Sequence, residues 1–283
     1  MLRRIAIFSA VAVYVLVVGC ILAGEKSGSS THNATTVGYI GNGQPLKGLP
    51  LVSVTMQIQR TDWIDKYEQN IDEIAALGAD TVQFVVDPRQ ENADSERIYL
   101  DMRMTPTPEQ LGQLIKHAKD KGLRVTLMPI VLLDDPKGND WRGTIHPADW
   151  HEWFDSYRNV MNEYAWIAEA NHVDLLVVGS ELVSAENHLD EWDHTIQMIR
   201  ERFHGKLTYS SNWDHYRSVK FWDKLDMIGM NSYWDFGTKS EPNPSVDHIV
   251  DRWHEIQEDL FKFQQQQKKP LMFLEIGWFS QKK

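Results

Sequence analysis

Cysteine is almost absent from the sequence. Among its 283 residues Cys20 stands alone, so the chain can form no internal disulfide and no cysteine-based metal site. The sequence HExxH does not occur, and the eleven histidines show no metal-ligand spacing. We therefore expect neither a metal centre nor a cofactor.

Basic residues are also scarce. Lys and Arg number 29 against 40 Asp and Glu, which gives a formal net charge of −11. Nucleic acid is not an expected partner, because contacts with phosphate need clustered Lys and Arg. No GxGxxG follows the first predicted strand, which argues against a dinucleotide-binding sheet. No GxSxG occurs either, so Ser180 is not part of a nucleophile elbow.

The first residues have the layout of a secretory signal peptide. Arg3 and Arg4 form a positively charged start, and residues 5–18 form an apolar run. Gly19 and Cys20 resemble the cleavage site of a bacterial lipoprotein, in which the cysteine carries the lipid. The alternative is an uncleaved signal anchor, because the apolar run is nearly long enough to span a bilayer. Both interpretations place the rest of the chain outside the cytoplasm, attached to a membrane.

The predicted signal peptide covers residues 1–19. The rest of the sequence divides into a tether and one domain. Residues 20–48 begin with the lipidated Cys20 and are rich in Gly, Ser, Thr and Asn, which is typical of a flexible tether. Residues 49–283 are predicted to form the domain. The eleven tryptophans of the chain are many for its length, and they suggest a surface on which flat ligands stack.

Short apolar runs alternate with amphipathic helical patterns along the domain. Such alternation predicts an α/β fold with a parallel sheet. Two closures fit, a doubly wound sheet and a (β/α)8 barrel of the TIM type. Polar and aromatic residues at nearly every strand end favour the barrel, because a barrel gathers its strand ends around one mouth. The seven predicted strands are residues 51–58, 81–87, 124–133, 173–178, 207–213, 227–234 and 271–275.

An eighth β/α unit is expected to be missing. The predicted helices cover residues 62–77, 108–121, 147–171, 189–203, 219–224 and 246–267. After the last predicted strand, Trp278 is followed by only five residues, which cannot supply another strand and helix. The barrel is therefore predicted to be open on one side.

Two glutamates stand at the ends of predicted strands. The fourth strand is followed by Gly179, Ser180 and Glu181, and the seventh ends at Glu275. In an eight-stranded ring these positions lie on opposing sides of one mouth. Cleavage of a glycosidic bond needs two carboxyl groups, one to protonate the leaving oxygen and one to attack the sugar or activate water. The pair therefore predicts a glycoside hydrolase.

Five stretches of the sequence resemble glycoside hydrolase family 113, a family of β-1,4-mannanases in the retaining clan A. They are WRGTIHP at 141–147, VGSEL at 178–182, TYSSNWD at 208–214, FWDKLDMIG at 221–229 and FLEIGW at 273–278. The resemblance implies Glu181 as acid/base and Glu275 as nucleophile in a double displacement on a β-linked mannan. It also implies that Tyr233 forms a hydrogen bond with the nucleophile. Most of the clan has Asn before the acid/base, where this sequence has Ser180.

The chemistry sets expectations for the surroundings of the two carboxyl groups. Glu181 should lie in apolar or negative surroundings that keep it protonated. Glu275 should be ionised, with donors such as Tyr233, Asn231 or Arg142 close to it. The substrate-binding residues are expected to be Trp141, Arg142, Asn212, Trp213, Asn231, Tyr233 and Trp278. Trp234 also stands at a strand end, whereas Trp153, Trp166, Trp192 and Trp253 lie on predicted helices and are expected to pack in the interior.

The predicted partners are a β-linked oligosaccharide or polysaccharide and, through the lipid anchor, a membrane. A different class of function is also open. The chain could be a glycan-binding lipoprotein that kept the groove of the barrel but lost turnover with the final strand. Release of reducing sugar from a β-glycan distinguishes the two hypotheses.

Overall fold

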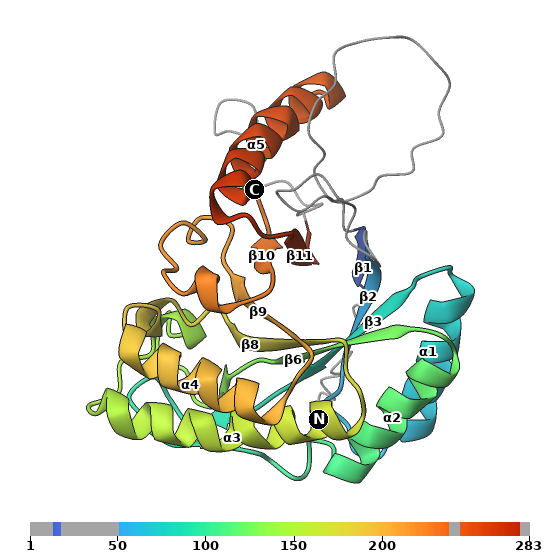
Figure 1. Ribbon diagram of the computed structural model, residues 1–283, viewed down its shortest axis with the longest axis vertical. Helices are drawn as coiled ribbons and strands as arrows, with labels where there is room; N and C mark the ends of the chain where they lie inside the picture. The colour runs from blue at the N-terminus through green and yellow to red at the C-terminus, as the bar shows by residue number, and fades with distance from the viewer. Residues whose placement is uncertain (1–13, 18–50, 238–243, 278–283) are drawn as a thin grey trace, which may run out of the picture.

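A computed structural model describes residues 14–17, 51–237 and 244–277. Its centre is one curled sheet with the strand order β1-β2-β3-β6-β8-β9-β10-β11. Every neighbouring pair from β2 to β11 is parallel. Figure 1 shows helices α1 to α4 against one end of the sheet, and α5 at the opposite end, above β10 and β11. The described chain is therefore a half-open barrel of seven parallel strands with helices outside, as the sequence predicts.

All seven predicted strands are present. Several read as continuous apolar runs because both faces are covered; every residue of β3 and of β8 is buried. The strands are β2 (Val52–Gln57), β3 (Thr81–Val86), β6 (Arg124–Pro129), β8 (Leu175–Ser180), β9 (Lys206–Ser211), β10 (Ile228–Ser232) and β11 (Leu271–Ile276).

The helices begin and end at the signals that the sequence carries. Thr107 accepts a hydrogen bond from the Gln110 backbone, the Gln110 side chain accepts one from the Thr107 backbone, and Pro108 opens α2. Gly122 follows α2 at a φ of +80°, which favours glycine. The long helices are α1 (Ile64–Ala76), α2 (Pro108–Asp120), α3 (Trp150–Ala170), α4 (Leu189–Arg202) and α5 (Val246–Gln267), and the short ones η1 (Arg142–Thr144), η2 (Val183–Ala185) and η3 (Trp222–Lys224).

Four short strands add to the predicted set; three lie outside every predicted strand, and one, at residues 132–133, lies inside the strand predicted at 124–133. A small sheet has the order β5-β4-β7, formed by β4 (Arg89–Gln90), β5 (Ile98–Tyr99) and β7 (Leu132–Leu133). Two residues per strand are too few for a periodic signal. The fourth, β1 (Tyr14–Val17), pairs antiparallel with β2 and lies within the stretch interpreted as the apolar part of a signal peptide. Cys20 lies outside the described residues, so its lipidation stays a prediction.

An aromatic cluster, defined here as Trp153, Phe154, Tyr157, Trp192, Tyr209 and Phe221, packs between α3, α4 and the sheet. Its ring pairs are mostly edge-to-face, and each such pair stabilises the fold by about 1 kcal/mol beyond burial alone. Trp153 and Trp192 are fully buried, as predicted for helix-borne tryptophans. Trp253 is partly buried against the core. The prediction for Trp166 is wrong, because this side chain lies on the outer face of α3 with half of its surface exposed.

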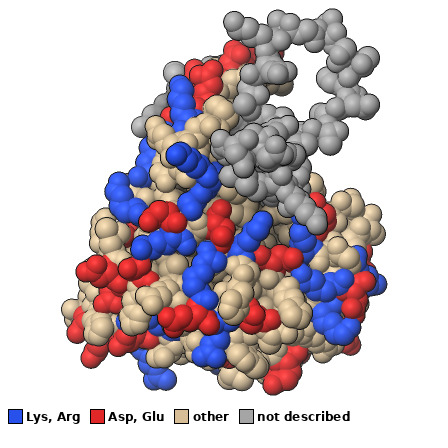
Figure 2. Space-filling model, in the orientation of Figure 1, with Lys and Arg blue, Asp and Glu red and all other residues tan. Residues whose placement is uncertain are grey.

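Acidic and basic side chains are interspersed on the face of the molecule seen in Figure 2. Exposed charged side chains also form ion pairs between neighbouring elements, such as Lys224 of η3 with Asp193 of α4. Exposed pairs of this kind contribute little to stability, so the fold depends on the buried core. In the part of the chain that the structure describes, no helix has the length and apolar character needed to cross a membrane.

Candidate active site

Both predicted glutamates follow an irregularity in the sheet. In the β8–β9 pair the register runs from Val177 opposite Thr208 to Ser180 opposite Ser210, so β8 carries one additional residue. In the β10–β11 pair Met230 lies opposite Phe273 and Asn231 opposite Glu275, so β11 carries one additional residue. An extra residue bends its strand and redirects the side chains after it, and such bulges are common beside active sites. The fold therefore alters both strands immediately before Glu181 and at Glu275.

Glu181 is buried at the end of β8 and is held by two donors. Arg142 Nη2 donates to Oε2, and Asn231 Nδ2 donates to Oε1 at 2.7 Å. Asn231 is itself oriented by Ser210, whose hydroxyl donates to Asn231 Oδ1 at 2.8 Å. The backbone of Glu181 has a φ of +52°, in the left-handed region. For a residue other than glycine this conformation costs on the order of 1 kcal/mol, and such strain is concentrated at functional sites.

Glu275 lies half-buried on β11, and the expected contact with Tyr233 is present. The Tyr233 hydroxyl donates to Glu275 Oε2 at 2.7 Å. Burial raises the pKa of Glu275 above its ordinary value, and the charge of Glu181 raises this pKa further. The hydrogen bond from Tyr233 and the charge of Arg142 oppose that rise.

Asn231 joins the two glutamates into one site. On β10 its Cα is the register partner of Glu275, while its side chain donates to Glu181. The charges of Glu181 and Arg142 also both act on Glu275. The two carboxyl groups thus belong to one constellation at the ends of β8, β10 and β11.

Two of the expected donors bind the other carboxyl group. Asn231 and Arg142 were expected near Glu275, and the structure has both on Glu181. The reason for Asn231 is the Ser210 hydroxyl on β9, which fixes its amide oxygen and turns its NH2 group toward β8. The reason for Arg142 is that η1 packs against η2, immediately after Glu181. Glu181 is buried and lies near the carboxyl group of Glu275, but the positive charge of Arg142, expected at Glu275, contacts Glu181 directly.

Four buried polar atoms near the glutamates have no hydrogen-bond partner among the described residues. They are Arg142 Nε, Ser180 Oγ, Asn212 Oδ1 and Ser232 Oγ. Ser180 precedes Glu181, Asn212 follows β9, and Ser232 ends β10, so these atoms come from three consecutive strands. A buried polar group without a partner costs stability and is uncommon in native proteins. A polar ligand at this mouth could satisfy these atoms.

The tryptophans of the mouth divide into candidate stacking residues and packing residues. Trp141 is half-buried above Gly143, where a Cβ would lie 2.3 Å from its ring. Trp213 is half-buried, with its ring centroid 6.1 Å from that of Trp234. Trp234 itself is 7 % exposed, so it packs in the interior. Trp278 lies outside the described residues.

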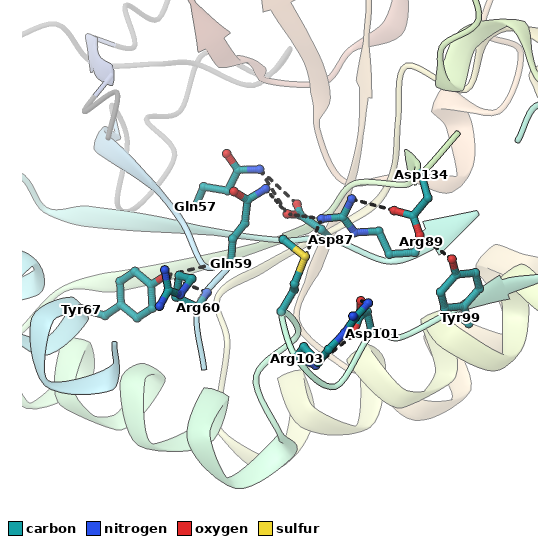
Figure 3. Close-up of polar contacts among 11 residues, drawn as sticks. Gln57, Gln59, Arg60, Tyr67, Asp87, Arg89, Tyr99, Asp101, Arg103 and Asp134 are labelled. Atoms are coloured by element: carbon teal, nitrogen blue, oxygen red, sulfur yellow. Dashed lines mark hydrogen bonds and ion pairs between the residues drawn. The ribbon is translucent and has the colours of Figure 1, made fainter. Parts of the chain in front are cut away.

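A second polar cluster lies at the ends of β2, β3 and β7 and on β4, and Figure 3 shows Gln57, Gln59 and Arg89 pointing toward Asp87. Gln57 and Gln59 donate amide hydrogens to the Asp87 carboxylate, and Arg89 Nη2 lies 3.9 Å from Asp87 Oδ2. Arg89 also donates to Asp134 at 3.1 Å. Burial raises the pKa of Asp87, while the hydrogen bonds from the glutamines and the charges of Arg89 and Arg142 oppose that rise. Because Arg142 also donates to Glu181, the cluster lies beside the glutamates.

Asp87 ends one predicted strand and Asp134 directly follows another, whereas no sequence motif identifies the two glutamines. Gln57 and Gln59 stand two positions apart at the end of a strand, which puts them on one face. That spacing was the available signal. Within residues 14–17, 51–237 and 244–277, no group of three His, Cys, Asp or Glu side chains could hold a metal ion.

Several solved structures are similar to this fold. A GH113 β-1,4-mannanase in a complex is 27 % identical, with a TM-score of 0.66 over 80 % of this chain and 71 % of that one. Another structure titled GH113 β-1,4-mannanase is 26 % identical, with a TM-score of 0.64 over 78 % and 73 %. The GH113 β-mannanase from Alicyclobacillus acidocaldarius is 23 % identical, with a TM-score of 0.70 over 81 % and 72 %, and shows the shared fold.

No curated protein sequence matches this chain. The model of Glycoside Hydrolase Family 113 matches residues 52–283, which include the whole sheet from β2 to β11 and both glutamates. The chain belongs to Glycoside Hydrolase Family 113.

Proposed function

We propose that this glycoside hydrolase cleaves β-1,4-linked mannan by double displacement, with Glu181 as acid/base and Glu275 as nucleophile. The observation that carries the proposal is the position of Asn231, which is paired with Glu275 along the sheet and bonded to Glu181 across it. The substrate class is supported by the two β-1,4-mannanases of the same family that are 27 % and 26 % identical.

The two carboxyl groups take complementary parts in each half of the reaction. In the first, Glu275 attacks the anomeric carbon while Glu181 gives its proton to the leaving oxygen. In the second, Glu181 takes a proton from water, which attacks the anomeric carbon and releases Glu275. The hydroxyl of Tyr233 holds Glu275 in place for attack.

The unpartnered polar atoms around the glutamates support a sugar as the ligand. Arg142 Nε can donate to a hydroxyl oxygen, and Asn212 Oδ1 can accept from a hydroxyl group. The serine hydroxyls can do either. Trp141 and Trp213 are half-buried at the same mouth, where the apolar face of a sugar ring can stack on them, and Trp278 is proposed for the same part.

Hydrolysis of β-1,4-mannan with release of reducing ends tests the proposal. The Glu275→Ala variant is expected to lose about 10⁵-fold in kcat/KM, because the covalent step needs this carboxylate. The Glu181→Ala variant should regain turnover with azide on a substrate with a good leaving group and form a β-glycosyl azide. An unchanged circular dichroism spectrum serves as the control for folding. Normal turnover by Glu275→Ala would rule the mechanism out, and binding of mannan without hydrolysis would favour the glycan-binding alternative.

We also propose that Cys20 anchors the enzyme to a membrane outside the cytoplasm. The support is the order of Arg3 and Arg4, the apolar run and Gly19 directly before the lone cysteine. The Cys20→Ser variant should leave the membrane fraction and carry no labelled fatty acid. A variant that stays lipidated would contradict the anchor.

A further inference from the structure

The backbone after β8 is bonded to a buried tyrosine at the point where its conformation is strained. Glu181 has its φ at +52°, and the next amide, Leu182 N–H, donates to the Tyr209 hydroxyl at 2.9 Å. Tyr209 is fully buried on β9. The amide that follows a residue changes direction when that residue leaves the left-handed region, so this bond is compatible with one arrangement of Glu181.

A buried carboxyl group holds the tyrosine in place. The Tyr209 hydroxyl donates to Glu186 Oε1 at 2.9 Å, and Glu186 is 3 % exposed. Burial raises the pKa of Tyr209, so its hydroxyl keeps the proton that it donates. Burial also raises the pKa of Glu186, with the Asp214 charge adding to the rise and His215, 3.8 Å away, opposing it. An oxygen of Glu186 can accept this hydrogen bond whether the group is ionised or not.

The ring of Tyr209 is fixed as firmly as its hydroxyl. It packs edge-to-face against Trp192 at 5.5 Å and Phe221 at 5.3 Å, between ring centroids. It also closes against the backbone of β8, where a Cβ on Gly179 would lie 3.0 Å from the tyrosine ring. The Tyr209 side chain therefore cannot move to keep its hydrogen bond if Glu181 changes conformation. The bond forms only when the backbone at Leu182 adopts the position that Tyr209 requires.

We infer that Tyr209, held by Glu186, is a positioning residue that keeps the backbone of Glu181 left-handed and thereby aims its carboxyl group at the glycosidic oxygen. The inference deepens the proposed function and rests on it for the role of Glu181. Tyr209 is fully buried, so it acts through the backbone of the neighbouring strand. The strain at Glu181 is offset by the bond that Leu182 forms only in this conformation.

Substrates that differ only in their leaving group separate positioning from general damage. From a 2,4-dinitrophenyl β-manno-oligoside the dinitrophenolate departs without protonation. From the phenyl analogue the phenol departs only with a proton from the acid. The Tyr209→Phe variant is expected to lose 10- to 100-fold in kcat/KM on the phenyl substrate and less than about 3-fold on the dinitrophenyl substrate. Its crystal structure should show Glu181 outside the left-handed region.

The partner of Tyr209 offers a matched pair of variants. Glu186→Gln keeps an oxygen that accepts the tyrosine hydroxyl, so it should stay within about 3-fold of the parent on both substrates. Glu186→Leu removes the acceptor and should behave like Tyr209→Phe. Tyr164→Phe is the control for the loss of a buried hydroxyl, since Tyr164 is buried and its hydroxyl has no hydrogen-bond partner among the described residues.

The outcomes distinguish this inference from the proposed function. Equal losses on both substrates, or no loss on either, would overturn the positioning role, as would a left-handed Glu181 in crystals of Tyr209→Phe. If Glu181→Ala shows no dependence on the leaving group, the assignment of the acid/base fails instead. The crystal structure tests the backbone argument even then, because the conformation of Glu181 is measured without turnover.

Discussion

The ends of β8 and β11 each deliver one glutamate after a bulge, yet the fold supports them differently. The end of β8 is bonded to the aromatic cluster at Val178, whose carbonyl accepts from Tyr157, and at Leu182. Glu275 on β11 instead accepts from Tyr233, a side chain that is 37 % exposed. The backbone around Glu181 is therefore fixed by the core, whereas Glu275 is held through its side chain at the surface of the mouth.

The two glutamates differ in the free-energy cost of placing them in the site. At Glu181 the cost is backbone strain, which buried hydrogen bonds offset. At Glu275 the cost is the loss of water around a carboxylate beside another carboxylate, which raises its pKa. Proton transfer needs accurate direction, and nucleophilic attack needs an available charge. The support on each side matches the part proposed for its glutamate.

The largest effect that sharpens this comparison is expected at Tyr233. Tyr233→Phe removes a hydrogen bond that lowers the pKa of Glu275, so this pKa should rise further above its ordinary value. Because the nucleophile must be ionised, the acidic limb of the kcat/KM profile should move to higher pH. We expect a loss of roughly 10- to 100-fold on both aryl substrates, since attack itself is impaired.

The control is the melting temperature, which should barely change because Tyr233 is partly exposed. A normal acidic limb in Tyr233→Phe would show that this hydroxyl does not tune Glu275. A loss confined to the phenyl substrate would place Tyr233 with the acid/base, and the comparison between the two strand ends would break.

Gly179 on β8 and Gly277 after β11 test how rigid the surroundings of the two strand ends are. A Cβ on Gly179 would lie 2.8 Å from the buried Trp192 ring, and a Cβ on Gly277 would lie 2.9 Å from Tyr233. Trp192 is enclosed, so Gly179→Ala should destabilise the fold by about 1–3 kcal/mol. Tyr233 can rotate toward solvent, so Gly277→Ala should cost roughly 0.5 kcal/mol or less. Chemical denaturation measures both; equal costs would mean that the two strand ends are equally rigid.

The sequence predicts the strands and the two glutamates because each is a local signal. A buried parallel strand reads as an apolar run, and Glu181 and Glu275 interrupt such runs at their ends. Family-specific stretches then predict the bond from Tyr233 to Glu275. These signals need no knowledge of how distant strands meet.

The partners of Glu181 could not be predicted in the same way. Asn231 turns toward β8 because Ser210 on a third strand bonds its amide oxygen, and a bulge sets its register. Tyr209 meets Leu182 only after β8 and β9 have paired with a shifted register. Contacts between strands depend on bulges, and a bulge leaves no periodic signal in one sequence.

The smallest expected effect concerns stability and has opposite signs at the two glutamates. The pKa of Glu275 is raised in the folded state, so between the unfolded and folded pKa values the unfolded chain ionises first and stability falls as pH rises. Glu275→Gln removes this penalty and should stabilise the protein by roughly 1 kcal/mol at pH 7. The gain should shrink as the pH falls toward 4 and disappear below it, where the carboxyl group becomes protonated in both states.

Glu181→Gln is the matched variant for this measurement. Its carboxylate is paired with the largely buried Arg142, and a neutral amide leaves that guanidinium without its counter-charge. This variant should therefore lower the melting temperature at pH 7, where Glu275→Gln raises it. If both variants shift the melting temperature in the same direction, the contrast between a carboxylate held by an ion pair and one raised by burial does not hold. A gain for Glu275→Gln that persists unchanged at pH 4 would mean that its source is packing rather than charge.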